Sequence, residues 1–388
     1  MTGLLFFRFE RWLMVALIVL ILLWSRTEIV TAAQPEAGVG GADANWQPAR
    51  TWVFCVGLLR WENPQHGPFP QKHRRDAEML QVLKECGVPA AQITYLCDEQ
   101  GTTAAIEKEF TRFLKQPAKD DLVIVYYCGH GYNTSDHKQT FLVSYDTAGP
   151  NRGWEVASIA REINRLCRAQ RVVIALDHCF SGAMAEAVRQ LPDPKVSFAV
   201  LASAHHNSSS TGNWTFTENL ISAFRGRGYM DDDGNGQITF SELDANIQLD
   251  MAFAERQMSQ SLFTKGFNPN FVIRTSHKPT DPEIGQRAEI EWQGKYYRGF
   301  VIGRNGALSR VHYYGYQESD DEWVTPERLR TPTPVTRPIN SPVEIQWKSE
   351  WYRGRIIGVK HGLHLVKYDK WGPEWNEWVT FDRLRDVK

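Results

Sequence analysis

Two short apolar segments, each leading into a reactive side chain with a glycine close by in the sequence, are the most constraining feature of this chain. Residues 123–128 lead into His130, and residues 172–176 lead into Cys179, 49 residues further on. In a parallel α/β sheet the carboxyl ends of neighbouring strands open onto one crevice, where such sheets carry out chemistry. A cysteine and a histidine meeting there form a nucleophile and its base. The pattern therefore predicts a parallel sheet with a Cys–His pair at its edge.

Apolar segments of strand length alternate with segments of helical spacing from residue 51 to residue 275. This alternation predicts an α/β domain with a mostly parallel sheet covered by helices on both faces. A polar break over 275–282 ends the pattern, and short strands rich in aromatic residues follow. The chain is thus expected to contain one α/β domain followed by smaller β units.

Composition excludes some classes of partner. The chain has 388 residues, which is enough for two to three domains, and its formal net charge is −1. Nucleic-acid binding is not expected, because it ordinarily requires a basic face. We expect no organic cofactor.

The N-terminal segment has the layout of an export signal. Arg8 and Arg11 precede the apolar run 12–24, and the small residues 31–33 follow. Residues 1–33 are therefore predicted to be a signal peptide, or an uncleaved N-terminal anchor, and the protein to act outside the cytoplasm. Membrane contact is expected only if the segment stays uncleaved. Residues 34–50, rich in Gly, Ala and Pro, are predicted to be a linker.

The cysteine content argues against a disulfide framework. The chain has six cysteines, so five remain if Cys179 must stay a thiol, and an odd number cannot all pair. Export permits disulfides. The single pair we consider is Cys86 with Cys97.

An internal repeat with a constant offset of 55 residues occupies the C-terminal part. Residues 288–330 align without gaps on residues 343–385, with 18 identities in 43 positions. A proline-rich connector over 331–342 separates the copies and should act as a semi-rigid spacer. The sequence predicts two copies of one small β unit, repeat 1 over 285–331 and repeat 2 over 341–387.

The two strand-end motifs, Gly129-His130-Gly131 and Asp177-His178-Cys179-Phe180-Ser181-Gly182, resemble those of the caspase–metacaspase family, within the clan that includes legumain-type peptidases. The resemblance covers residues 51–275. It implies that Cys179 is the nucleophile, that His130 transfers the proton, and that the N–H groups of Gly131 and Cys179 form the oxyanion hole. A helix expected to start near Ser181 should lower the pKa of the thiol.

The resemblance also bears on specificity. It implies that Asp177 lines an acidic pocket for Arg or Lys at P1, although Asp177 could equally be a structural acceptor for backbone amides. The serine-rich stretch 203–210 departs from the metacaspase pattern and is closer to legumain-type sequences. Cleavage after Asn therefore stays open as an alternative.

Residues 231–242 match a twelve-position calcium loop. Asp231, Asp233 and Asn235 provide oxygens at positions 1, 3 and 5, Gln237 provides a carbonyl at position 7, and Glu242 is the bidentate ligand at position 12. Thr239 stands at position 9 and Gly236 makes the turn. Such oxygen donors favour Ca²⁺, which we expect to stabilise or activate the domain. Because only one such loop is present, a solvated acidic turn before a helix is the alternative.

Each repeat resembles a Tudor-like β-barrel of the SH3 type. Such barrels can hold methylated lysine or arginine in an aromatic cage, although a barrel of this size also needs large aromatics for its core. Residues 285–388 carry 17 Lys and Arg against 14 Asp and Glu, a net charge of +3. We expect the repeats to bind protein or an envelope surface. The candidate cage residues are Tyr313, Tyr316 and Trp323, with Tyr368, Trp371 and Trp378 in the second copy.

The leading hypothesis is an exported cysteine endopeptidase that forms a thioester acyl-enzyme and prefers basic P1 residues in a protein or peptide substrate. One alternative is a non-catalytic binding protein in which a retired peptidase fold carries the tandem repeats. Another is a legumain-like peptidase or transamidase that runs the same acyl-enzyme chemistry.

Overall fold

The computed structural model describes residues 45–149, 152–276, 281–332 and 336–387. The export segment predicted over 1–33 lies outside these residues, as does the part of the predicted linker up to residue 44. Among the described helices, none has the length and apolarity that crossing a membrane requires. The described residues all belong to one contact unit, Ala44–Lys388.

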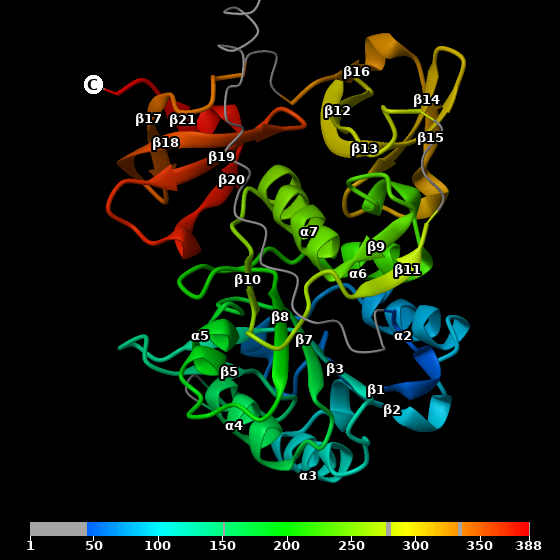
Figure 1. The fold of residues 1–388 in the computed structure, drawn as a ribbon, viewed down its shortest axis with the longest axis vertical. Helices are drawn as coiled ribbons and strands as arrows, with labels where there is room; N and C mark the ends of the chain where they lie inside the picture. Colours follow the sequence, from blue (N-terminus) through cyan, green and yellow to red (C-terminus); the bar gives the residue numbers. More distant parts are fainter. Residues whose placement is uncertain (1–44, 150–151, 277–280, 333–335, 388) are drawn as a thin grey trace, which may run out of the picture. The chain divides into compact units, whose positions relative to one another are not determined.

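A six-stranded sheet forms the centre of the α/β domain (Figure 1). Its strand order is β10-β8-β7-β3-β1-β2, and only β10 runs antiparallel to its neighbour. The predicted fold class, a mostly parallel sheet flanked by helices, is confirmed. The strands are β1 (Thr51–Gly57), β2 (Ile93–Cys97), β3 (Leu122–Cys128), β7 (Arg171–Asp177), β8 (Ser197–Ala202) and β10 (Gln260–Phe263).

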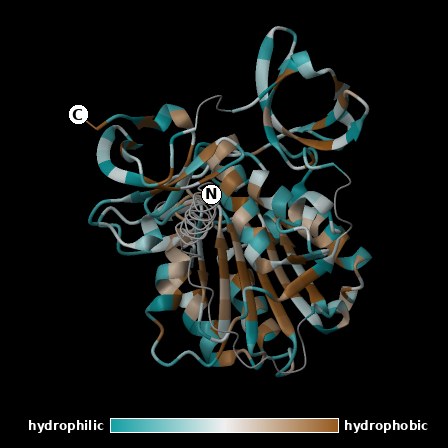
Figure 2. Ribbon diagram, turned by 45° about the horizontal axis from the view of Figure 1, so that its top comes forward, coloured by the Kyte–Doolittle hydropathy of each residue, from teal (hydrophilic) through white to brown (hydrophobic). Residues whose placement is uncertain are grey.

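The two central strands are apolar at almost every position because both faces of the sheet are covered. All residues of β3 are buried, and β7 is buried from Val172 onward. Figure 2 shows these strands as the hydrophobic centre of the domain. Continuous apolar runs of this kind are typical of parallel strands between two helical layers.

Three helices pack on each face of the sheet. The core on one face contains residues such as Phe54, Phe110 and Ile159, from β1, α3 and α4. The core on the other face contains residues such as Tyr126, Leu220 and Ile247, from β3, α6 and α7. The first face carries α3 (Thr103–Leu114), α4 (Val156–Leu166) and α5 (Ala183–Arg189), and the second carries α2 (Arg75–Glu85), α6 (Thr215–Arg225) and α7 (Phe240–Ala254).

Two small sheets complete the domain. One has three strands, β4 (Gly131–Asn133), β5 (Thr140–Leu142) and β6 (Trp154–Glu155), and it starts directly after His130. The other pairs β9 (Gln237–Thr239) antiparallel with β11 (Val272–Thr275). The sequence pattern missed most of these strands because they have only two to four residues.

The prediction that residues 34–50 form a linker is wrong for residues 45–50, which lie just before β1. Asn45 forms a bridge with Val272, and Trp46 is buried with its ring 5.0 Å from that of Phe224. The indole N–H of Trp46 donates to Thr51 Oγ1 at 2.8 Å. Residues 45–50 therefore pack on the domain, because Trp46 gains apolar contacts that composition alone did not reveal.

The cysteines are all free, which corrects the disulfide considered between Cys86 and Cys97. The Cys86 thiol donates to the carbonyl of Phe224 at 3.3 Å. The Cys97 thiol donates to Asp98 Oδ2 at 3.6 Å. Each thiol thus has its own partner elsewhere in the domain.

The two repeats have the same topology, as their constant offset predicts. Each forms a curled five-stranded antiparallel sheet, with orders β15-β14-β13-β12-β16 and β20-β19-β18-β17-β21. Even the bulges correspond, lying between Val301 and Gly303 and between Ile356 and Gly358. Repeat 1 has β12 (Arg287–Trp292), β13 (Lys295–Asn305), β14 (Leu308–Tyr313), β15 (Glu322–Val324) and β16 (Leu329–Arg330); repeat 2 has β17 (Pro342–Trp347), β18 (Glu350–Lys360), β19 (Leu363–Tyr368), β20 (Glu377–Val379) and β21 (Leu384–Arg385).

Candidate active site

The parallel register of β3 and β7 brings His130 and Cys179 to neighbouring positions. Cys128 pairs with Asp177 as the last couple of the ladder, and each candidate lies two residues beyond it. The N–H of Gly129 donates to the carbonyl of Asp177 at 3.3 Å, which continues the pairing into the loops. Both side chains therefore leave the same edge of the sheet.

The imidazole of His130 is held by two aromatic rings and one carbonyl. Its ring centroid lies 4.4 Å from Trp61 and 4.6 Å from Phe69. Nε2 lies 3.0 Å from the carbonyl oxygen of Gly67. Because a carbonyl can only accept, Nε2 carries the proton in the neutral ring and Nδ1 is left to accept one. Burial lowers the pKa of His130 below 6.5.

The Sγ atom of Cys179 is held by the backbone of Ser210. The N–H of Ser210 donates to Sγ at 3.2 Å, and Sγ lies 3.7 Å from the carbonyl of the same residue. Phe180 follows in a left-handed conformation (φ 63°), and its N–H donates to the carbonyl of Ser208. Within the described residues, no hydrogen bond joins Sγ to His130. Catalytic hydrogen bonds are often absent from ligand-free structures, so this arrangement is compatible with a working pair.

The expected lowering of the Cys179 pKa is not what the site produces. Burial raises the pKa of the thiol above 9.0, although the contact with Ser210 opposes that change. The following helix, α5, begins only at Ala183 and has seven residues. Removal of the thiolate from water outweighs the weak field of so short a helix.

Gly131 lies directly against the cysteine loop. A Cβ atom at this position would come within 2.4 Å of the carbonyl oxygen of Cys179 and 2.3 Å of His178 Nδ1. The N–H of Val143 donates to the carbonyl of His130, so Gly131 faces Leu142 as a non-hydrogen-bonded pair. Its own N–H therefore points away from β5, as an oxyanion donor requires.

Asp177 lies in a cavity beside the two candidates. Its Oδ2 accepts from Thr217 Oγ1 at 2.8 Å, and the hydroxyl of Tyr126 lies 2.7 Å from the same Oγ1. Burial raises the pKa of Asp177 to about 7. The cavity has a volume of about 270 Å³, and we call it the substrate cavity. It is lined by Leu59, Phe69, Pro70, Lys72, His73, Cys128, Gly129, Asp177, Thr211, Gly212, Asn213, Trp214, Gly315 and Gln317.

Comparison with known proteins decides the family. The profile of the caspase domain, peptidase C14, matches residues 71–267, about half of the chain. This chain belongs to the caspase-domain family. No curated protein matches it. The crystal structure of protein GSU0716 from Geobacter sulfurreducens is similar to 59% of this chain and 98% of its own, with 14% identity and a TM-score of 0.41.

Several contacts of His130 and Cys179 could not be inferred from the sequence. Trp61, Gly67 and Phe69 hold the imidazole, and they precede the matched region. Gly67 and Ser210 make these contacts with backbone atoms, and every residue type has such atoms, so the residue type does not reveal the contact. The serine-rich stretch 203–210 was recognised only as a departure from a pattern, whereas its last residue contacts Sγ.

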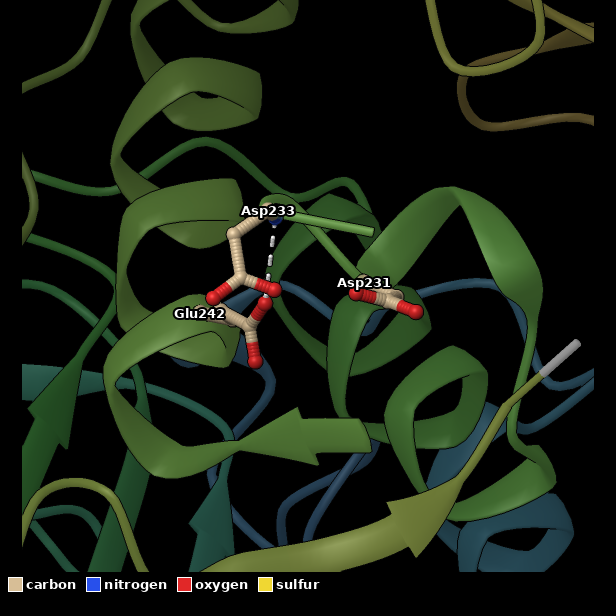
Figure 3. A group of neighbouring side chains, drawn as sticks. All are labelled: Asp231, Asp233 and Glu242. Atoms are coloured by element: carbon tan, nitrogen blue, oxygen red, sulfur yellow. Dashed lines mark hydrogen bonds between the residues drawn. The ribbon is translucent and has the colours of Figure 1, made fainter. Parts of the chain in front are cut away.

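The predicted calcium loop folds with its carboxylates together at the start of α7 (Figure 3). Oxygens of Asp231, Asp233 and Glu242 all lie within 4.8 Å of one another. Backbone N–H groups of the loop donate to them, among them Gly236 to Asp231 at 2.8 Å and Asp232 to Glu242 at 2.9 Å. The side chain of Asn235 donates to Asp233, and its Oδ1 accepts from the N–H of Gln237. The donor set, all oxygen, fits a hard cation such as Ca²⁺.

Proposed function

We propose that this protein is a cysteine endopeptidase in which Cys179 is the nucleophile and His130 moves the proton. The observation that carries the proposal is the shared register of β3 and β7, which sends both side chains from one sheet edge. The carbonyl of Gly67 orients the imidazole of His130. In other sites with a nucleophile and a base, a third group orients the base in the same way.

The two pKa shifts suggest how the reaction begins. Burial raises the pKa of Cys179 and lowers that of His130, so the resting pair is a thiol and a neutral imidazole. His130 takes the thiol proton as Sγ attacks the scissile carbonyl carbon, and the oxyanion is held by the N–H groups of Gly131 and Cys179. The imidazolium then protonates the leaving amine as the C–N bond breaks. Water hydrolyses the remaining thioester and restores the thiol.

Covalent labelling tests this proposal. A peptidyl acyloxymethyl ketone, which reacts with an activated catalytic thiol, should add one mass increment to the wild-type protein, and peptide mapping should place it on Cys179. The Cys179→Ala variant should gain no increment, whereas Cys97→Ala, which changes another partly buried thiol, should label like the wild type. An unlabelled wild-type protein would instead favour the retired-scaffold alternative.

Specificity for basic P1 residues is the finer part of the proposal. Asp177 lines the substrate cavity and is its acidic group, while Lys72 and His73 also contribute to the lining. Peptides that differ only at P1, with Arg, Lys, Asn or Asp, provide the test. Preference for Arg or Lys supports the acidic pocket, and preference for Asn would transfer the assignment to the legumain-like alternative.

The pKa of Asp177, raised to about 7, predicts a pH dependence of this preference. Below that pH the carboxyl becomes protonated and neutral, so it no longer attracts a guanidinium group. We expect the ratio of kcat/KM for Arg over Asn substrates to fall roughly tenfold per pH unit below about pH 7. Titration of His130 and Cys179 affects both substrates and cancels in the ratio. A ratio that stays constant from pH 5 to pH 8 would contradict the assignment.

We also propose that the loop 231–242 binds Ca²⁺ and stabilises the caspase domain. With free Ca²⁺ at ten times Kd, the free energy of unfolding should rise by about 1.4 kcal/mol, and Tm by about 3 °C. The Glu242→Gln variant should lose this response, because an amide cannot act as a bidentate anionic ligand. Asp232→Asn is the matched control, since Asp232 at loop position 2 instead pairs with Lys360. An equal response to Ca²⁺ in wild type and Glu242→Gln would disprove the site.

For the C-terminal repeats, we propose binding to protein or to an envelope surface, consistent with their modest net charge of +3 and with the exposed aromatics of repeat 1. Export of the protein likewise stays a prediction from residues 1–33.

A further inference from the structure

One wall of the substrate cavity comes from repeat 1 rather than from the caspase domain. Gly315 and Gln317 line the cavity together with Asp177. Both belong to the loop that follows β14, residues 314–318, which we call the wall loop. Ligand sites occur preferentially where two domains meet. The cavity is therefore complete only when repeat 1 lies against the caspase domain.

Two hydrogen bonds to helices anchor the wall loop. The hydroxyl of Tyr314 donates to Asp250 of α7 at 2.6 Å, and the carbonyl of Tyr316 accepts from Arg75 of α2 at 3.1 Å. Asp250 and Arg75 are both buried. Hydrogen bonds in which one partner is charged are stronger than neutral ones. These two contacts therefore hold the loop at Tyr314 and at Tyr316.

Glu318 provides a third anchor at the end of the wall loop. Its Oε1 accepts from Arg225 at 3.0 Å and from Arg227 at 3.1 Å. Exposed ion pairs of this kind contribute little individually, so they supplement the other two anchors. The anchoring positions 314, 316 and 318 alternate with the cavity positions 315 and 317. The wall loop thus contacts the caspase domain on either side of each residue that lines the cavity.

The ring of Tyr316 packs on repeat 1 itself. It lies 6.2 Å from Tyr297 and 6.0 Å from Tyr313. These three rings line an open aromatic pocket of about 240 Å³ in repeat 1. Trp323, expected beside these rings, does not line the pocket. The wall loop is therefore held from both sides, by the caspase domain and by the rings of repeat 1.

Repeat 2 lacks the residues that anchor the wall loop. At the offset of 55 residues, Asp369 replaces Tyr314, Pro373 replaces Glu318, and a glycine replaces Gln317. A proline has no side-chain group that could pair with an arginine. Two repeats with the same topology thus differ at the loop that reaches the substrate cavity, and only the loop of repeat 1 carries this set of residues.

Repeat 2 also differs at the aromatic pocket. Trp375 replaces Asp320, and its ring lies 4.8 Å from Trp371 and 5.8 Å from Trp347. The chain itself therefore fills the space that is open in repeat 1.

We propose that repeat 1 completes the part of the substrate cavity that receives the P1 side chain, and that Gln317 contacts this side chain and sets part of the P1 preference. The half-buried side chain of Gln317 ends in an amide, which can both donate and accept hydrogen bonds. It does so without adding charge to a cavity that already contains Asp177 and Lys72. The proposal rests on the proposed endopeptidase function, because it concerns the substrate of the same site.

Substitutions that introduce charge at Gln317 test this contact in two directions. Gln317→Glu should raise the ratio of kcat/KM for Arg over Asn at P1 by about tenfold, and Gln317→Lys should lower it by about tenfold, since a charge in the wall attracts or repels a guanidinium group. The measurement uses full-length protein and peptides that differ only at P1. A merely structural role of Gln317 would change both rates together and leave the ratio unaltered.

Ser319 provides the matched control. It is exposed, lies two residues further along the chain, and does not line the substrate cavity. Ser319→Glu and Ser319→Lys add the same charges outside the cavity, where salt screens them, and should keep the ratio within about twofold of the wild type. If the Ser319 variants shift the ratio as strongly as the Gln317 variants, the effect is a distant field and the contact with P1 is wrong.

Binding without cleavage separates this proposal from the proposed activity. The same peptides are titrated by calorimetry into full-length Cys179→Ala protein, with and without each Gln317 substitution, and the ratio of Kd values should shift in the same two directions. A wild-type protein that cleaves no peptide, combined with shifted binding ratios, would overturn the endopeptidase function and support the wall. An active wild-type protein whose ratios do not respond to Gln317, or a Cys179→Ala protein that binds none of the peptides, would overturn the wall.

Discussion

Replacing His130 with alanine is expected to lower kcat/KM for peptide hydrolysis by about 10²–10⁴-fold. The imidazole is the group that takes the thiol proton, and burial keeps the Cys179 pKa above its ordinary value, so little thiolate forms without it. The measurement is hydrolysis of a fluorogenic peptide, with thermal unfolding to show that the variant is folded.

Two other histidines sharpen this experiment. His137→Ala changes an exposed histidine and should leave kcat/KM as in the wild type. His178 is the competing base, because it adjoins Cys179 and its buried Nε2 has no partner. Burial lowers the pKa of His178 to about 4, and its Nδ1 lies 2.7 Å from the carbonyl of Cys179. If activity survives in His130→Ala but disappears in His178→Gln, the proposed base is wrong.

Replacing Gly131 with alanine is expected to lower kcat/KM by about 10²–10³-fold, which is the usual effect of losing one oxyanion donor. The new methyl group would meet the carbonyl oxygen of Cys179 at 2.4 Å, so the two loops must separate. Such a shift moves the N–H of Gly131 away from the position of the oxyanion. The effect should appear in kcat, because the donor acts mainly in the transition state.

Gly149 provides the matched control for this change. A Cβ atom there would have no neighbour within 4 Å. Gly149→Ala should therefore retain the kcat and KM of the wild type. A Gly131→Ala variant with unchanged kcat would show that the oxyanion is stabilised elsewhere.

Repeat 1 is joined to the caspase domain by a buried ion pair, and repeat 2 by a ring contact between Trp375 and His205 at 4.2 Å. Arg287 of repeat 1 donates to Asp250 of α7 at 2.7 Å, and the hydroxyl of Tyr314 donates to the same carboxylate at 2.6 Å. Both ion-pair side chains are less than a tenth exposed. Breaking such a pair by removing one partner leaves an uncompensated buried charge. Gly315 and Gln317, which line the substrate cavity, follow Tyr314 closely in the chain.

The motifs at the ends of β3 and β7 illustrate what could be predicted from sequence. Apolar runs that lead into a reactive side chain with a nearby glycine are local patterns, so the strands and the neighbouring positions of His130 and Cys179 followed from them. The repeat was equally visible, because Trp292 and Trp347 occupy the same register 55 residues apart. These inferences needed only periodicity and spacing.

The protonation state of the site could not be predicted in this way. The expectation of a lowered Cys179 pKa considered the helix that follows and ignored the loop ending in Ser210, which covers the sulfur. The hydrogen bond between His130 Nε2 and the carbonyl of Gly67 could not be predicted either, because every residue type has a backbone carbonyl.

The sequence by itself determined the order of strands and helices, the paired reactive residues and the duplicated β unit, because these depend on the spacing of side chains along one chain. Only the tertiary structure decided the direction of the pKa shifts, the packing of Trp46, and which of the two repeats keeps an open aromatic pocket. Those properties depend on how much water and how many atoms surround a group, and distant segments of the chain provide these surroundings.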